Sequence, residues 1–229
     1  MSEYKKIGII VADEDEFKPL ADLVTRGKFS ESEFLKRRIL RFKSGSADIY
    51  AMHCGVGKVN AAAAAAHLAD EGCEIMLNYG LSGGVSGIRR GEITAPNKFL
   101  EHDFDLSGIG YKLCEKPLQK YIYNADENLI GVAKKVVPAL KLGTAVSGDH
   151  FICDNEVRNN LKENFNAMSC DMETAAIAYV CEFSGVPFLA LRRISDDAGA
   201  DATEAYREMN VSGETLLCDY IIDIIKELL

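Results

Sequence analysis

The sequence predicts an α/β fold built around a largely parallel sheet, with residues 1–229 forming a single domain. Short apolar runs alternate with longer helical patterns, 48% of the residues are hydrophobic, and no Pro-, Gly- or Ser-rich linker interrupts the chain. Two parallel strands need a crossover segment between them, and that segment is usually a helix. The alternation of strands with helices therefore favours a parallel sheet. The length also fits two small domains, but nothing in the sequence separates them.

The strands of this sheet are predicted from five compact apolar runs, which are typical of strands buried on both faces. In chain order they cover residues 7–11, 49–54, 75–78, 143–146 and 187–191. Helices are predicted between and after them, at residues 58–69, 128–139, 173–183 and 213–229. The first of these helices contains six consecutive alanines, which favour a helix and allow it to pack closely on a sheet.

Composition and charge exclude several classes of protein. Lys and Arg total 26 against 35 Asp and Glu, so the formal charge is −9, which would repel nucleic acid and anionic lipid. The apolar run near the amino terminus is too short for a secretory signal, and no run reaches the roughly 18 residues of a membrane span. The seven cysteines form no CxxC motif, which favours reduced thiols over a metal site. We therefore expect a cytoplasmic protein without metal or organic cofactor, and without nucleic-acid or membrane partners.

Polar residues follow each predicted strand, at the edge where open α/β sheets bind ligands. These polar segments are residues 13–16, 55–58, 78–84, 147–151, 171–173 and 195–197. The acidic segment 13–16 alone fits a helix start, a magnesium site or a catalytic carboxylate. A phosphoacceptor receiver domain would need a lysine after its last strand, where this chain has Arg192 to Asp196.

Two glycine-rich segments resemble phosphate or dinucleotide loops without matching them. Residues 55–58 lack the earlier glycine and the following Ser or Thr of a phosphate loop, because Met52 and Val59 stand there. They are predicted to form a tight turn between a strand and a helix. Residues 78–84 are predicted to form a second glycine turn, and they lack the dinucleotide spacing.

Three carboxylates after three separate strands carry the functional prediction. Glu16, Glu173 and Asp196 each have an ordinary structural explanation, as a helix cap or a turn residue. Together, and accompanied by two glycine-rich segments in this order, they are harder to explain as local features and favour a catalytic site.

At this point the chain resembles the nucleoside phosphorylase superfamily, and most closely its 5′-methylthioadenosine/S-adenosylhomocysteine nucleosidase branch. The resemblance spans nearly the whole chain in family order. It rests on residues 7–10, Glu14 and Glu16, 55–60, Gly80, 83–84, 91–93, 102–105, 147–149, Phe151, 171–178 and 192–196. It implies a three-layer fold, with a central mixed, largely parallel twisted sheet flanked by helices, and hydrolysis of the N-glycosidic bond between adenine and a 5′-thio-substituted ribose.

The resemblance also implies the site residues. Asp196 would be the general acid at adenine N7, steadied by Ser195, and Glu16 would activate the attacking water. Glu173 would hold the ribose hydroxyls. The remaining substrate-binding residues would be Met172, Phe151 stacked on adenine, Ile152 whose backbone reads the base edge, Gly83, Val56, Arg192, and Tyr206 against the alkylthio group.

The chemistry requires residues of these types. Cleaving a glycosidic C–N bond produces an oxocarbenium-like sugar, so the leaving purine needs a proton while water approaches the opposite face. A free Asp has a pKa of about 3.9, and keeping it protonated near neutrality takes a shift of roughly 3 units, or about 4 kcal/mol. Burial in an apolar pocket can supply that shift.

Alternatives remain open at this stage. A phosphorylase would use phosphate as nucleophile, and Arg89 and Arg90 are the residual reason to consider one. An inactive nucleoside-binding module is the second alternative. Leu81 and His150 depart from the nucleosidase pattern. The resemblance further implies a homodimer contacted through residues 102–105. The sequence leaves the choice open among methylthioadenosine, adenosylhomocysteine, deoxyadenosine and futalosine-type nucleosides.

Overall fold

The structure is a computed structural model that describes residues 4–211 and 215–229. In these residues, eleven strands form one sheet. The strands are β1 Lys6–Val11, β2 Phe29–Phe34, β3 Arg37–Ser44, β4 Ala47–His53, β5 Ile75–Gly84, β6 Ile93–Thr94, β7 Lys98–Glu101, β8 Tyr123–Asn124, β9 Thr144–Ser147, β10 Ala167–Asp171 and β11 Phe188–Asp196. The helices are α1 Glu14–Val24, α2 Lys58–Asp70, α3 Glu127–Val136, α4 Asn155–Phe165, α5 Thr174–Ser184, α6 Ala202–Val211 and α7 Thr215–Leu228.

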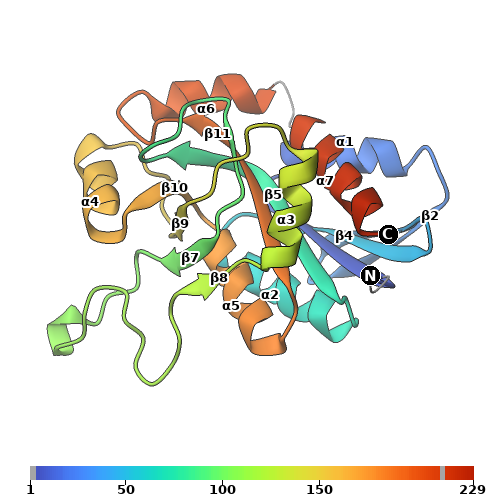
Figure 1. The fold of residues 1–229 in the computed structure, drawn as a ribbon, viewed down its shortest axis with the longest axis horizontal. Helices are drawn as coiled ribbons and strands as arrows, with labels where there is room; N and C mark the ends of the chain where they lie inside the picture. The colour runs from blue at the N-terminus through green and yellow to red at the C-terminus, as the bar shows by residue number, and fades with distance from the viewer. Residues whose placement is uncertain (1–3, 212–214) are drawn as a thin grey trace.

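The sheet is mixed, and pairing in its central part is mostly parallel, as predicted. The strand order is β2-β3-β4-β1-β5-β10-β9-β7-β8, and β11 pairs with β5 and β6. Parallel pairs join β1 to β4 and β5, β5 to β11, and β9 to β7 and β10. Helices flank this sheet: α2 packs on α5, while α1 and α3 pack on α7 (Figure 1). None of the helices in the described ranges is long and apolar enough to span a membrane.

Strand β5 organises the centre of the sheet. On one edge it pairs with β11 over most of its length. On the other edge β1 pairs with its first part, ending at Ile10 beside Asn78, and β10 pairs antiparallel with its last part, Cys170 beside Gly83. The carboxyl ends of β1 and β10 therefore approach one another along the same edge of β5, with residues 79–82 between them. This gap is where polar side chains from both strand ends can meet.

The predicted elements are present, with informative differences at their ends. The segment 78–84 is not a turn: β5 continues through it, because β11 pairs with β5 as far as Gly83. Helix α3 stops at Val136 rather than 139, because Pro138 disfavours helical backbone at the residue before it, and Val137 is extended. The predicted start of the last helix at Gly213 lies outside the described residues.

Several elements were not predicted from the sequence. Strand β10, Ala-Met-Ser-Cys-Asp, contains no β-branched residue, and β2 is largely exposed and polar. Both are strands because of their neighbours: β10 lies between β5 and β9, and β2 pairs with β3. Such pairing is a tertiary effect that local propensity does not report.

Candidate active site

A cavity of about 90 Å³ opens where β1, β5, β10 and β11 end. It gathers residues that are far apart in the chain, from Ala12 to Tyr206. Ten of the eleven predicted site residues line it: Glu16, Val56, Gly83, Phe151, Met172, Glu173, Arg192, Ser195, Asp196 and Tyr206. Ile152 instead lines an adjoining small hollow, together with Phe151, Met172 and Asp196.

Glu16 lies in the first turn of α1, and its side chain is buried in the gap along β5. Its Oε1 accepts a hydrogen bond of 2.7 Å from the backbone N–H of Leu81. Its Oε2 lies over Gly80, where a Cβ would come within 2.6 Å of it, so only glycine leaves room for the carboxylate. Burial raises the pKa of Glu16 to about 8, against the opposing effects of the Leu81 N–H and the Arg192 charge.

The other members of the acidic segment have structural roles. Asp13 caps α1 by accepting a hydrogen bond from the Asp15 N–H, and Glu14 lies 3.1 Å from His53. In the described part of the chain, no three His, Cys, Asp or Glu side chains are placed so that together they could hold a metal ion. Asp13 therefore caps the helix, and both Asp13 and Glu16 line the cavity, but of these two only Glu16 is buried.

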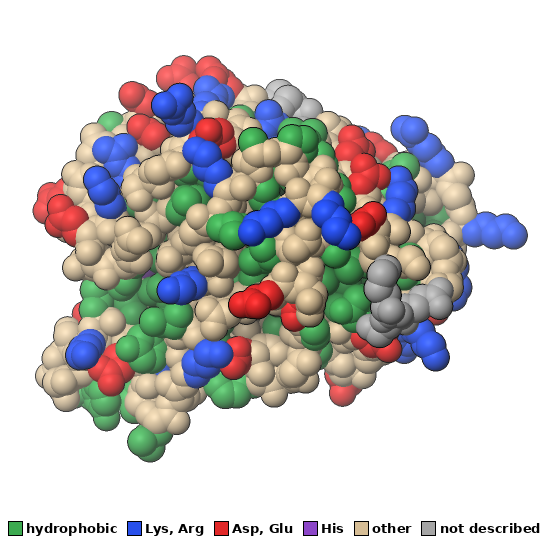
Figure 2. All heavy atoms as spheres, viewed as in Figure 1, with side chains coloured by type: hydrophobic (Ala, Val, Ile, Leu, Met, Phe, Trp, Pro, Cys, Tyr) green, Lys and Arg blue, Asp and Glu red, His purple; other side chains and the backbone are tan. Residues whose placement is uncertain are grey.

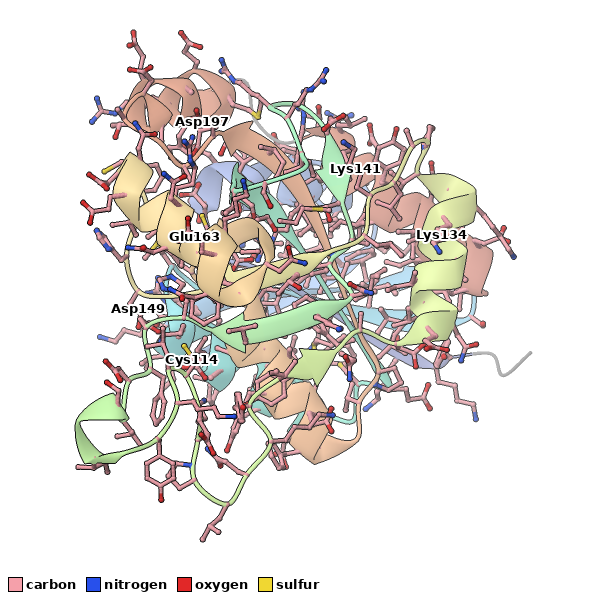
Figure 3. All side chains as sticks on the ribbon, turned by 60° about the vertical axis from the view of Figure 1, so that its left-hand side comes forward. Cys114, Lys134, Lys141, Asp149, Glu163 and Asp197 are labelled. Atoms are coloured by element: carbon pink, nitrogen blue, oxygen red, sulfur yellow. The ribbon has the colours of Figure 1, made fainter. Side chains whose placement is uncertain are left out.

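Asp196 is the last residue of β11 and is 2% exposed. Its Oδ2 lies 2.6 Å from the Ser195 hydroxyl, and its Oδ1 accepts the Ala198 N–H at 2.8 Å. Burial raises the pKa of Asp196, and these two hydrogen bonds act against it. Asp197, in contrast, is exposed beside α4, where Arg158 pairs with it (Figure 3). Successive side chains at the end of a strand point to opposite sides, so the Asp196 carboxyl points inward and the Asp197 carboxyl points outward.

Glu173 precedes α5 but does not cap it with its side chain. Asp171 does so instead, accepting the backbone N–H groups of Glu173 and Thr174. The Glu173 carboxylate is thereby left to face the cavity, where its Oε1 accepts the Gly57 N–H at 2.9 Å. Burial raises the pKa of Glu173 to about 7, although Arg192 lowers it.

The segment 55–58 forms the predicted turn between β4 and α2. Gly57 has φ +100, a backbone conformation that favours glycine. Its N–H donates to Glu173, and the next N–H, from Lys58, donates to Asp149 at 2.8 Å. The turn therefore binds carboxylates of its own chain, which agrees with its departure from the phosphate-loop motif.

Arg192 lies beneath the cavity and is 1% exposed. Its guanidinium donates to Asn78 and Thr174, and its Nε lies 3.2 Å from Asp171 Oδ2. Asn78 and Thr174 were not among the predicted site residues. Their only sequence signal was position, since each follows or ends an apolar run at the ligand-binding edge.

Aromatic residues close the outer side of the cavity. The rings of Phe151 and Tyr206 meet edge to face, with centroids 5.5 Å apart. Tyr206 comes from α6, and it lies in the same cavity as the carboxylates.

Four residues left alternatives or doubts open in the sequence: Arg89, Arg90, Leu81 and His150. Of these, only Leu81 lines the main cavity. Arg89 and Arg90 are exposed, and Arg90 contacts Ala205 and Glu208 on α6. Leu81 contributes its N–H to Glu16 and its side chain to the wall. His150 is exposed at the adjoining hollow.

Comparison with known proteins places this site in a family. The family model of the Phosphorylase superfamily matches residues 6–226. A 5′-methylthioadenosine/S-adenosylhomocysteine nucleosidase from Staphylococcus carnosus is 31% identical, covering 97% of this chain and all of that protein. An aminodeoxyfutalosine nucleosidase from Campylobacter jejuni is 28% identical over 97% of this chain and 99% of its own.

Solved structures agree with the sequence matches. A 5′-methylthioadenosine/S-adenosylhomocysteine nucleosidase from Helicobacter pylori, solved with butyl-thio-DADMe-Immucillin-A, superposes with a TM-score of 0.93 at 25% identity. The match covers 99% of this chain and 100% of that one. By its sequence and its fold, the chain belongs to the phosphorylase superfamily and, within it, to the 5′-methylthioadenosine/S-adenosylhomocysteine nucleosidase family.

Proposed function

We propose that this protein hydrolyses the N-glycosidic bond of 5′-methylthioadenosine and S-adenosylhomocysteine, releasing adenine and the 5-thio-substituted ribose. The observation that carries the proposal is that Glu16 and Asp196, 180 positions apart, line one cavity as buried carboxyls with raised pKa values. Cleavage of a C–N glycosidic bond needs one acid and one base on opposite sides of the sugar.

Asp196 is proposed to be the acid. Its raised pKa favours the protonated form, which can transfer a proton to N7 of the departing purine. The Ser195 hydroxyl, 2.6 Å away, fixes the orientation of the carboxyl group and stabilises the carboxylate that forms.

Glu16 is proposed to be the base. The Leu81 N–H holds Oε1, which leaves Oε2 free to take a proton from the attacking water. A pKa of about 8 brings this carboxylate much closer to the strength needed for proton abstraction near neutral pH than a free Glu would be.

Glu173 is proposed to accept hydrogen bonds from the ribose hydroxyls. With Oε1 bound to Gly57, its second oxygen, Oε2, lies 4.0 Å from Arg192. A carboxylate here also lies close to the positive charge that develops on the sugar, so its contribution grows in the transition state. Phe151, Met172, Val56, Gly83 and Tyr206 are proposed to surround the base and the 5′-substituent, and Ile152 to read the base edge with its backbone.

Water rather than phosphate is the proposed nucleophile. Among the described residues that line the cavity, Arg192 is the one basic side chain, and Asn78, Thr174 and Asp171 already occupy its guanidinium. A phosphate ion would also meet the carboxyl groups of Asp13, Glu16, Asp171, Glu173 and Asp196 there. Its charge would be repelled unless those groups were protonated or neutralised.

We further propose a homodimer, formed around residues 102–105 and the loop that follows them. That loop, between β7 and β8, carries exposed Ile109, Leu113 and Leu118, and Val59 of α2 is exposed as well. Figure 2 shows hydrophobic side chains gathered at the lower left, where Figure 1 places this loop. Apolar surface of this kind is stabilised when a second protein covers it.

The direct test is an adenine-release assay on methylthioadenosine, adenosylhomocysteine, deoxyadenosine and aminodeoxyfutalosine, in buffer free of phosphate. Release without phosphate is expected, and the ratio of kcat/KM values across the four substrates defines the preference. Release that requires added phosphate would identify a phosphorylase instead. Tight nucleoside binding with unchanged substrate would identify a binding module. Sedimentation at micromolar concentration tests the dimer, and a monomer would contradict it.

A further inference from the structure

Ser82 carries a buried hydroxyl whose hydrogen-bonding capacity is unused by the described residues. The side chain lies on β5 and is 4% exposed, and its Oγ has no hydrogen-bond partner there. An unpartnered buried hydroxyl costs stability, so such a group calls for an explanation such as a bound water or ligand. Ser82 lines the cavity between Glu16 and Asp196, and the mechanism above gives it no role.

The position of Ser82 on its strand relates it to the proposed base. Side chains two residues apart on a strand share a face, so Ser82 extends from the same face of β5 as the Cα hydrogen of Gly80 that Glu16 Oε2 covers. Glu16 and Ser82 also line the same cavity, so a water molecule held there has both side chains beside it.

The backbone of Ser82 connects it to the proposed acid. Its carbonyl oxygen lies 3.2 Å from the Ser195 hydroxyl, which in turn lies 2.6 Å from Asp196. Ser82 thus sits between the group that would take a proton from water and the group that would give one to the purine. The reacting carbon of the sugar must pass through this part of the cavity.

We propose that the Ser82 hydroxyl is the second anchor of the attacking water. The inference rests on the proposed hydrolysis. One O–H of the water donates to Glu16 Oε2 and the other donates to Ser82 Oγ, which leaves a lone pair directed at the anomeric carbon.

The proton and electron balance leaves Ser82 unchanged. As the oxygen–carbon bond forms, one water proton passes to Glu16. The electrons of the C–N bond pass to the purine, which takes its proton from Asp196. Ser82 keeps its own proton throughout and only orients the water.

The test compares Ser82→Ala with Ser169→Ala. Ser169 is a matched control: its Oγ is also buried without a partner, but the residue lies on β10 and does not line the cavity. Both substitutions remove one buried hydroxyl, and the Tm of each variant shows whether it remains folded. Only Ser82→Ala is expected to lower kcat, by about tenfold, with KM and the affinity for a non-hydrolysable methylthioadenosine analogue changed by less than about twofold.

Each outcome separates this inference from the proposed function. A Ser82→Ala enzyme with wild-type kcat would overturn the role of Ser82 alone. So would a raised KM at unchanged kcat, because Ser82 would then contact the nucleoside rather than the water. A wild-type enzyme that releases no adenine without phosphate would contradict the proposed hydrolysis itself.

Discussion

Carboxylates gather in two regions of this molecule, buried in one and only partly covered in the other, and their partners differ. In the cavity, Glu16, Glu173 and Asp196 accept hydrogen bonds mainly from backbone N–H groups or a hydroxyl, and burial raises their pKa values. Beside β7, Lys58 pairs with Glu101 and Asp103, at 3.2 and 2.5 Å, and Lys116 also pairs with Glu101. There, although burial acts to raise it, the hydrogen bonds from Lys58 and the Asp149 N–H lower the pKa of Asp103.

The difference shows that burial and partners together set the pKa of a carboxylate. A lysine partner compensates for lost hydration and keeps the group ionised, which serves stability. Burial without such a partner moves the pKa toward neutrality, where the group can exchange protons with a substrate. Substitutions in the two regions should therefore affect different observables.

Asp196→Asn is expected to have the largest effect on turnover. The amide can donate a hydrogen bond to the purine but cannot transfer a proton, so kcat should fall about 10³-fold or more. Calorimetry should show nucleoside affinity within about threefold of wild type. Substantial remaining turnover would remove Asp196 from the role of acid.

Glu16→Gln is expected to lower kcat about 10²-fold or more, because water is no longer deprotonated. In the wild type, kcat/KM should rise with pH up to about pH 8, since the free carboxylate is the active form. In the variant, the residual kcat/KM should no longer rise with pH over this range. A rise that remains would mean that the ionisation of another group causes it.

The same residue should affect stability in a pH-dependent way. Its folded pKa of about 8 exceeds the ordinary value of 4.5, so the folded state holds a proton that the unfolded state releases. The stabilising contribution is complete below pH 4.5 and is lost as pH rises through 8. The free energy of unfolding, measured in urea between pH 5 and 9, should therefore fall more steeply with pH for wild type than for Glu16→Gln. Equal slopes would contradict the raised pKa of Glu16.

Glu173→Gln should have an intermediate effect, divided between binding and turnover. The amide oxygen can still accept the Gly57 N–H, but the negative charge beside the sugar is lost. We expect KM to rise and kcat to fall, each about tenfold. A change in KM alone would mean that Glu173 contributes equally to the ground state and the transition state.

Lys58→Gln should have the smallest effect on turnover, with kcat within about twofold of wild type. It removes the partner of Glu101 and Asp103, so the free energy of unfolding should fall by about 2 kcal/mol. Lys226→Gln breaks the exposed pair with Asp223 and is the control, with no measurable loss expected. A large loss of turnover in Lys58→Gln would mean that the two regions are coupled.

The sequence predicted strands β1, β4, β5, β9 and β11 and helices α2, α3, α5 and α7, because their patterns are local. It did not show that β5 continues through residues 78–84, since glycines there indicate a turn until a neighbouring strand pairs with them. Nor did it show that Asp171, rather than Glu173, caps α5. Both carboxylates precede the helix, and only the fold decides which of them the helix uses.

What the sequence determined by itself was the α/β class and the identity of the candidate chemical groups, because apolar periodicity and residue type are written along the chain. The tertiary structure decided which of those groups share a cavity, how deeply each is buried and which backbone N–H each accepts. Those properties set the pKa values, and they depend on atoms brought together from β1, β5, β10 and β11, whose distances no stretch of sequence contains.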